Sequence, residues 1–232
     1  MTLVSTHALT AFYGDFQALF GIDVEIGAGE AVAIIGANSA GKSTFLSSIA
    51  GLLPGSRDSI VLDGAPIGGM PAHVIVRRGV ALVPEGRRLF PSLSVMENLL
   101  IGGYARRPGA WSLERIYRLF PALEERRHVP ATHLSGGEQQ MVALGRALMA
   151  NPRLLLCDEI SLGLAPVAIK RIYESLASIL AEGTSILLVE QDIRQALQVA
   201  GYVYCLQEGR VSLQGRPGEL SFERISEAYF GL

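Results

Sequence analysis

The sequence predicts an α/β protein built on a mostly parallel β-sheet. Short apolar runs such as Ala31–Ile35 are typical of strands that helices cover on both faces. Helical patterns follow several of these runs, and that alternation indicates parallel strands joined by helices. The chain has 232 residues, a length that suits one domain with an inserted subdomain. We therefore expect a single α/β domain with an insert.

Composition narrows the possible functions. The formal net charge is −2 and the sequence pI about 6.1, so we expect no nucleic-acid partner. The N-terminus lacks a signal-peptide pattern and no apolar run approaches ~20 residues, which favours a soluble, cytoplasmic protein. Cys157 and Cys205 lie in apolar runs and are expected to be buried free thiols. The hydrophobic share of 49% hints at an apolar contact surface for a partner.

The first part of the chain predicts an N-terminal antiparallel β subdomain. Residues 3–11 and 19–26 alternate between apolar and polar side chains, and Tyr13-Gly14-Asp15 between them is turn-forming, which places Tyr13 on a loop. Capping and turn residues then predict further strands and helices along this half of the chain. The strands are expected at 31–35, 60–63 and 79–83, and the helices at 44–50 and 71–77.

A glycine-bounded loop with the spacing G-x-x-x-x-G-K-S joins the strand at 31–35 to the next helix. This order of strand, loop and helix indicates phosphate binding, because backbone N–H groups and the helix N-terminus point at the anion. Lys42 would reach the β- and γ-phosphates of a nucleotide, and the Ser43 hydroxyl would bind Mg²⁺. The loop alone does not distinguish among kinases, GTPases and transport ATPases. Its residues are Gly36, Ala37, Asn38, Ser39, Ala40, Gly41, Lys42 and Ser43, with Thr44 next.

Two later strands end in polar residues. The run 153–159 ends in Asp158 and Glu159, and the run that begins at Thr184 ends in Glu190 and Gln191. Ligands of parallel sheets collect at the carboxyl ends of strands, where the phosphate loop also lies. We assign Asp158 to Mg²⁺, and Glu159 to orienting and deprotonating an attacking water. A hairpin over 202–206 and 210–214 and a short helical tail complete the chain.

The middle of the chain predicts helices. A capping box, Ser94 with Glu97, begins one helix, and a second spans Ser112–Phe120. A further capping box, Ser135 with Glu138, places Gly136 and Gly137 in the first turn of another helix that ends at Asn151-Pro152. These glycines indicate either a flexible helix start or close approach of an anion.

The phosphate loop, LSGGEQQ at 134–140 and LLLCDE at 154–159 together resemble the ATP-binding-cassette (ABC) family, whose members power transport by ATP-driven dimerisation. The resemblance covers essentially the whole chain. The segments VPEGRRLF, SLGLAP, LVEQ and AYFG, at 83–90, 161–166, 188–191 and 228–231, are similar to the shorter (LivF-type) ATPase subunit of branched-chain amino-acid importers.

The resemblance implies a P-loop NTPase fold with a RecA-like core at about 1–84 and 150–232 and a helical subdomain at about 85–149. ATP and Mg²⁺ are the implied cofactors, and Tyr13 resembles the aromatic residue that stacks on adenine. Ser135, Gly136 and Gly137 resemble the signature that meets the γ-phosphate held by an opposite subunit. The insert would dock the transmembrane permease subunits at the inner face of the plasma membrane, and the solute-binding protein would be an indirect partner.

Five positions depart from the general family pattern. Glu85 stands where most members have a glutamine ligand to Mg²⁺, and Gln191 where most have a histidine that touches the γ-phosphate. Ser39 replaces a common glycine, although a side chain there disfavours positive φ. Ile160 replaces proline, and Ala165 replaces aspartate.

The sequence thus predicts an ATPase that drives import of branched-chain or related amino acids. Glu159 is the expected base, with Lys42 and Gln191 completing the catalytic set. The alternatives are a nucleotide-sensing cassette with weak hydrolysis and a soluble cassette outside transport. The sequence names neither the solute nor the second ATPase of the dimer, although the resemblance favours a sister subunit over a second copy.

Overall fold

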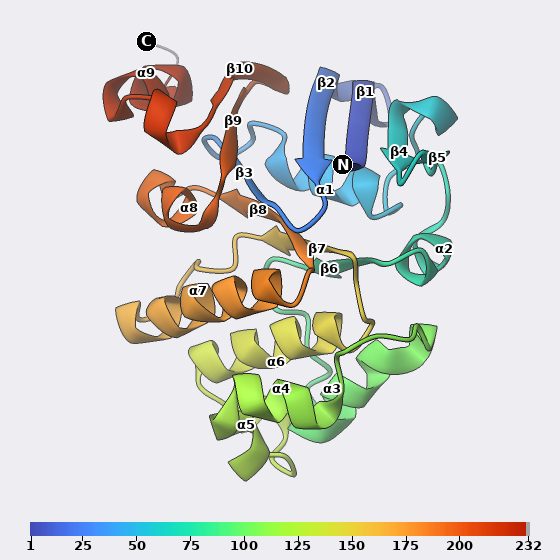
Figure 1. Ribbon diagram of the computed structural model, residues 1–232, viewed down its shortest axis with the longest axis vertical. Helices are drawn as coiled ribbons and strands as arrows, with labels where there is room; N and C mark the ends of the chain where they lie inside the picture. Colours follow the sequence, from blue (N-terminus) through green and yellow to red (C-terminus); the bar gives the residue numbers. More distant parts are fainter. Residues whose placement is uncertain (231–232) are drawn as a thin grey trace.

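The larger of two sheets has six strands in the order β10-β9-β3-β8-β7-β6 in this computed structural model, which describes residues 1–230 (Figure 1). Neighbours in this sheet are parallel except at the edge, where β10 is antiparallel to β9. Every residue of β3, β7 and β8 is buried, as their apolar runs predict. The strands are β3 (Ala31–Ile35), β6 (Val80–Val83), β7 (Leu154–Asp158), β8 (Ser185–Glu190), β9 (Tyr202–Gln207) and β10 (Arg210–Gly215).

The N-terminal antiparallel sheet has the order β2-β1-β4-β5. Its strands are β1 (Thr2–Tyr13), β2 (Phe16–Gly27), β4 (Ile60–Leu62) and β5 (Ala65–Pro66). The loop position predicted for Tyr13 is wrong, because Tyr13 is the last residue of β1 and pairs with Phe16. The turn is therefore limited to Gly14 and Asp15, and the two strands extend further than their alternation alone indicated.

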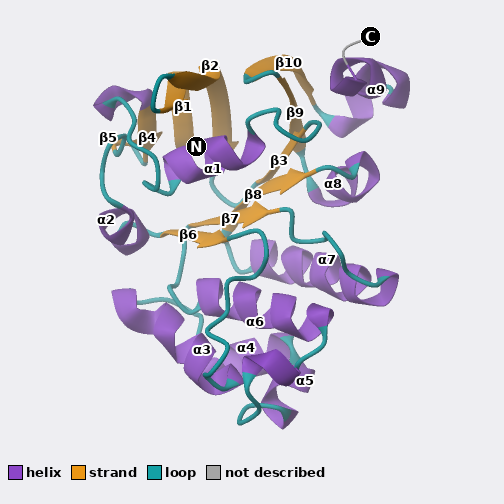
Figure 2. Ribbon diagram, turned by 180° about the vertical axis from the view of Figure 1, so that it is seen from behind, coloured by secondary structure: helices purple, strands orange, loops and turns teal. Residues whose placement is uncertain are grey.

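Helices separate the two sheets and cover the far face of the larger one. In both views α1 (Lys42–Ile49) lies between the sheets, and α6 (Gly136–Leu148) and α7 (Pro166–Ala181) lie across the larger sheet from it (Figures 1 and 2). Successive side chains of β7 point to opposite faces of the sheet. Leu156 belongs to the core beneath α1, whereas Leu155 belongs to the core beneath α6 and α7.

The remaining elements are short. The other helices are α2 (Ala72–Arg77), α3 (Val95–Gly102), α4 (Leu113–Leu119), α5 (Pro121–Glu125), α8 (Ile193–Val199) and α9 (Phe222–Phe230). Single 3₁₀ turns occupy Arg57–Ser59, Gly103–Ala105, Ala131–His133 and Pro217–Glu219. Gly231, the last residue of the AYFG segment, lies outside the described residues.

The predicted α/β class, with a mostly parallel sheet, an antiparallel subdomain and a helical insert, is confirmed. Both capping boxes form, at Ser94 with Glu97 and at Ser135 with Glu138. Within the insert, α3 and α4 pack closely on α6, since a Cβ at Gly145 would lie 2.7 Å from Leu99 and 2.8 Å from Ile116. Cys157 and Cys205 are buried free thiols, as expected, and burial raises the pKa of both.

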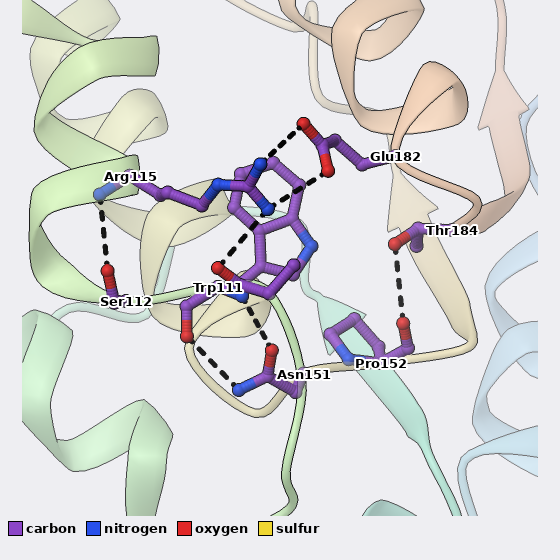
Figure 3. A network of polar contacts seen from close by, with 8 residues as sticks. Trp111, Ser112, Arg115, Asn151, Pro152, Glu182 and Thr184 are labelled. Atoms are coloured by element: carbon purple, nitrogen blue, oxygen red, sulfur yellow. Dashed lines mark hydrogen bonds and ion pairs between the residues drawn. The ribbon is translucent and has the colours of Figure 1, made fainter.

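A polar network ties the segment at the start of α4 to the loop between α6 and β7 and to the end of α7 (Figure 3). The Asn151 side chain accepts a hydrogen bond from the Trp111 N–H at 2.7 Å and donates to the Trp111 carbonyl at 3.1 Å. Arg115 on α4 forms an ion pair with Glu182 at the end of α7, with Nη1 3.0 Å from Oε2. The side chain of Asn151, one residue before Pro152, therefore anchors the segment that leads into α4. Among residues 1–230, no helix has the length and apolarity that crossing a bilayer requires.

Candidate active site

A cavity of about 750 Å³ lies where β3, β7 and β8 deliver their carboxyl ends, as expected for a ligand site in a parallel sheet. We call it the main cavity. The β1–β2 hairpin, the phosphate loop and the β9–β10 turn contribute to its wall. Its lining residues are Tyr13, Phe16, Gln17, Ala18, Phe20, Asn38, Ser39, Gly41, Lys42, Ser43, Thr44, Glu85, Glu159, Leu162, Gln191, Glu208 and Gly209.

The phosphate loop is shaped by its two glycines. Gly41 has φ +101°, and a Cβ there would lie 2.8 Å from the Leu19 side chain. A Cβ at Gly36 would lie 2.3 Å from the Leu206 carbonyl oxygen. The first N–H groups of α1 have no intrahelical acceptor, as in any helix, and no side chain of the N-cap residue Gly41 accepts from them. These groups are available to an anion.

Lys42 is buried inside this loop. Its Nζ donates to the carbonyl oxygens of Gly36 at 2.8 Å and Ala37 at 2.9 Å, and only 4% of the side chain is exposed. The Ala40 carbonyl accepts from the Gly209 N–H at 3.0 Å, which attaches the loop to the β9–β10 turn. The residues of the loop that line the main cavity are Asn38, Ser39 and 41–44. The other loop residues that make these contacts, Gly36, Ala37 and Ala40, do not line it.

Ser39 adopts the conformation that its side chain disfavours. Its φ is +66°, in the left-handed region where glycine is common. Glycine adopts this conformation without steric strain, which explains why glycine is common at this position in the family. The backbone of Ser39 is strained.

Replacing Ser39 by glycine is expected to raise the melting temperature by about 1–3 °C. The left-handed conformation costs a non-glycine residue roughly 1–2 kcal/mol, and the entropy that glycine loses on folding offsets roughly 0.5–1 kcal/mol of the gain. Thermal unfolding checks this. Ser56→Gly is the matched control, because Ser56 is exposed with φ −63° and should lose stability. A Ser39→Gly variant that melts below the wild type would contradict the assignment of strain.

Acidic side chains gather on one side of the cavity. The Ser43 hydroxyl donates to Asp158 Oδ1 at 3.0 Å, and Glu85 also lines the cavity. Burial, together with the nearby carboxylates of Glu159 and Glu85, raises the pKa of Asp158 to about 6, although the Ser43 hydrogen bond and the charge of Lys42 lower it. A divalent cation would relieve this accumulated negative charge.

The oxygen ligands fit a magnesium ion that shares its coordination with phosphates. No group of three or more His, Cys, Asp or Glu residues within 1–230 could hold a metal by itself. Mg²⁺ binds through one or two protein oxygens and completes its shell with waters and substrate phosphates. Ser43, Asp158 and Glu85 supply hard oxygens beside the phosphate loop, so this donor set suits that ion.

Glu159 sits between the other two predicted catalytic residues. Lys42 Nζ lies 3.4 Å from Glu159 Oε1, and the Gln191 side-chain amide donates to Glu159 Oε2. Glu159 itself has φ +46°, and its N–H donates to the Val189 carbonyl at 2.9 Å. The structure therefore brings Lys42, Glu159 and Gln191 into direct contact across three separate elements.

Aromatic side chains of the β1–β2 hairpin also line the cavity. Tyr13 is half-exposed, and its hydroxyl lies 3.4 Å from Thr44 Oγ1. Phe16, which is 71% exposed, lines the cavity beside it and was missed from the sequence. Its position next to the hairpin turn is the signal that could have identified it. Phe20, also missed, packs under the Arg210 guanidinium at 4.8 Å from the ring centroid and is therefore held in place.

The signature residues lie elsewhere. Ser135, Gly136 and Gly137 begin α6 and none of them lines the main cavity. The Ser135 hydroxyl donates to Glu138 Oε2 at 2.7 Å. A Cβ at Gly137 would lie 2.6 Å from Ala168 Cβ, so close packing of α6 on α7 gives this glycine a structural reason. Within a single chain, the signature segment is therefore separate from the main cavity.

Comparisons with known proteins agree with this arrangement. The family model described as "ABC transporter" matches residues 19–161. The high-affinity branched-chain amino acid transport ATP-binding protein BraG of Pseudomonas aeruginosa is 42% identical over 232 residues, which cover 99% of this chain and 100% of BraG. The probable branched-chain amino acid transport ATP-binding protein LivF of Archaeoglobus fulgidus is 33% identical over 230 residues, covering 96% and 98% of the two chains.

A solved structure resembles the fold over nearly the same length. It is the dimeric post-hydrolysis state of the ATP-binding cassette MJ0796 bound to ADP and Pi. Its TM-score is 0.82 and its sequence identity 25%, over 93% of this chain and 99% of that one.

Proposed function

Because the chain belongs to the ABC transporter family, we propose that it is the ATP-binding and ATP-hydrolysing subunit of an importer for branched-chain or related amino acids. The contact of Lys42 and Gln191 with Glu159, inside the cavity that the phosphate loop lines, is the observation that carries the ATPase assignment. The full-length similarity to BraG supports the solute class.

The nucleotide occupies the main cavity in this proposal. Its phosphates lie in the loop 36–43 and against Thr44, and its adenine stacks on Tyr13. The half-exposed ring of Tyr13, which lines the cavity, supports that placement. Entering phosphates compete with the Gly36 and Ala37 carbonyls for Lys42, which exchanges loop contacts for charge-assisted phosphate contacts.

Ser43, Asp158 and Glu85 would hold Mg²⁺, which supplies positive charge against the phosphate oxygens. Glu159 orients the attacking water and takes its proton, while Lys42 stabilises the charge on the transferred phosphoryl group. Gln191 donates to Glu159 and, as an amide, holds that carboxylate without titrating. Burial of the Lys42–Glu159 pair, at 4% and 9% exposed, supports a water-poor site in which these charges act strongly.

A second ATPase subunit completes each site. Ser135, Gly136 and Gly137 of one subunit would meet the γ-phosphate held by the other, and we expect the partner to be a sister subunit. Exposed apolar side chains between the half-sites support an interface there, since Leu162 is 52% and Val167 66% exposed. ABC cassettes dimerise, as the MJ0796 structure illustrates.

The helical subdomain, about 85–149, would dock the permease subunits at the inner face of the plasma membrane, so that the chain is peripheral there and meets the solute-binding protein only indirectly. An exposed apolar patch on and near α3 supports this role. It contains Phe90, Leu100, Ile101 and Tyr104.

The loop that links Glu85 to this patch is held in an unusual conformation. Gly86, Arg87 and Arg88 all have positive φ, of +71°, +67° and +47°. Arg146 on α6 donates to the Arg88 carbonyl at 2.8 Å and to the Arg87 carbonyl at 2.9 Å, and its guanidinium lies 5.7 Å from the centroid of the Phe90 ring. Arg146, which belongs to α6, thereby contacts both the loop that follows Glu85 and the exposed apolar patch.

Arg146→Ala is expected to lower ATP-driven leucine uptake by reconstituted transporter about tenfold, while ATP hydrolysis by the two ATPase subunits without the permease changes by less than about threefold. The variant lacks the two hydrogen bonds from Arg146 to the Arg87 and Arg88 carbonyls. A displacement of Glu85 is then no longer transmitted to the apolar patch. Uptake and phosphate release measured on the same preparations check this. Arg118→Ala, at an exposed arginine of α4, is the control and should match the wild type. Equal losses of uptake and of hydrolysis without the permease would contradict a coupling role.

The proposed function is tested by purifying the chain with the membrane proteins that bind it and reconstituting the complex in proteoliposomes. ATP should drive uptake of radiolabelled leucine, and phosphate release should accompany it. A complex that binds nucleotide but releases phosphate no faster than the isolated subunit would favour the sensor alternative. Association with ribosomes or nucleic acid in place of membrane subunits would overturn the assignment to transport.

A further inference from the structure

A second carboxylate is buried directly behind the proposed base. Glu190, the last residue of β8, is 2% exposed. Its Oε1 accepts hydrogen bonds from the Ser161 N–H at 3.2 Å and the Tyr173 hydroxyl at 3.0 Å, and its Oε2 accepts one from the Ser161 hydroxyl at 2.8 Å. Burial raises the pKa of Glu190 against these three hydrogen bonds. A buried carboxylate is costly, and none of the roles proposed above uses it.

Glu190 contacts the turn at residues 159–161, which is strained and lacks the proline that commonly follows the base in the family. Glu159 has φ +46°, which an L side chain adopts rarely, and Ile160 does not fix φ as proline would. Two consecutive residues of β8 hold this turn on both sides. The Val189 carbonyl binds the Glu159 N–H, and the Glu190 carboxylate binds Ser161. Gln191, which donates to Glu159, follows immediately.

We propose that Glu190 is a positioning residue that holds the Glu159–Ser161 turn so that the Glu159 carboxylate stays between Lys42 and Gln191. This inference rests on the proposed ATPase function. Glu190 takes no part in the proton transfer and acts through Ser161. Tyr173 extends the same anchor to α7, whose Ala168 packs against Gly137 of the signature.

The isosteric variant separates position from charge. In Glu190→Gln the side-chain oxygen can accept from the Ser161 N–H and the Tyr173 hydroxyl, and the amide can donate to the Ser161 oxygen after that hydroxyl rotates. All three contacts survive while the charge is lost. Glu190→Ala removes all three, and Ser161→Ala removes only the hydroxyl contact. Ser185→Ala is the matched control, because Ser185 is a buried serine at the other end of β8, with its hydroxyl 3.1 Å from the Gly27 carbonyl oxygen.

The experiment measures kcat and KM for Mg-ATP together with the melting temperature of each variant, on the same assembly that hydrolyses ATP as wild type. For Glu190→Ala we expect kcat to fall about 10–100-fold with KM changed by less than about threefold, since a small displacement of the base is costly. Glu190→Gln should retain kcat within about threefold of the wild type. Ser161→Ala should lose about 3–10-fold in kcat, and Ser185→Ala should lose none.

Wild-type kcat in Glu190→Ala, or a loss in Glu190→Gln as large as that in Glu190→Ala, would overturn the positioning role while leaving the ATPase function intact. If Glu190→Ala does not fold, Ser161→Ala decides, and an unchanged kcat in that variant would overturn the proposal. A wild-type assembly that hydrolyses no ATP would overturn the proposed function and this inference together.

Discussion

Replacing Glu159 by glutamine is expected to lower ATP turnover about 10²–10⁴-fold while the nucleotide stays bound and the dimer persists. The amide is nearly isosteric with the carboxylate but cannot accept the proton of the attacking water. Phosphate contacts of the loop do not involve Glu159, so binding survives. Slow hydrolysis then preserves the ATP that joins the two half-sites.

Phosphate release and light scattering, both on the chain mixed with its sister subunit and ATP, measure the two parts of this result. Glu174→Gln is the control, because Glu174 is an exposed glutamate on α7 whose carboxylate lies 3.9 Å from the Lys170 amino group. It should behave as wild type. A Glu159→Gln protein that remains monomeric and hydrolyses ATP at the wild-type rate would exclude Glu159 as the base.

Replacing Lys42 by alanine is expected to weaken ATP binding by about 10²-fold or more, because charge-assisted contacts to phosphate are lost. The same change removes the amino group that donates to the Gly36 and Ala37 carbonyls. It also removes the positive charge that lies 3.4 Å from the Glu159 carboxylate. The loop therefore loses both its ligand contact and an internal brace, and turnover should fall with affinity.

Titration calorimetry with ATP and Mg²⁺ measures this loss. Lys170→Ala removes the other lysine of the chain, one whose side chain is 77% exposed on α7, and is expected to leave the affinity unchanged. Equal affinities of the Lys42→Ala protein and the wild type would contradict the proposed phosphate contact.

Much of the fold followed from local patterns. The apolar runs at 31–35, 153–158 and 184–190 correctly predicted buried strands, and the serine–glutamate spacings correctly predicted two helix starts. These features depend on neighbours within a few residues, so the sequence records them directly. The family resemblance, carried by motifs of the same local kind, is also confirmed.

Other features depended on contacts between distant segments. Tyr13 belongs to β1 because it pairs with Phe16, and Gly137 is glycine because Ala168 of α7 approaches it. Phe16 and the β9–β10 turn enter the wall of the main cavity only because the two sheets meet there. A motif search finds none of these, since no local periodicity encodes a neighbour from another element.

The sequence by itself determined the phosphate loop, the carboxylates at the strand ends and the family, because each is written in a short, ordered run of residues. Only the tertiary structure decided that Glu159 lies between Lys42 and Gln191, that Ser39 has a left-handed backbone, and that the buried Glu190 carboxylate accepts hydrogen bonds from Ser161. The order β3-β8-β7 places the carboxyl ends of these strands side by side, and that order depends on pairing between segments that are far apart in the sequence.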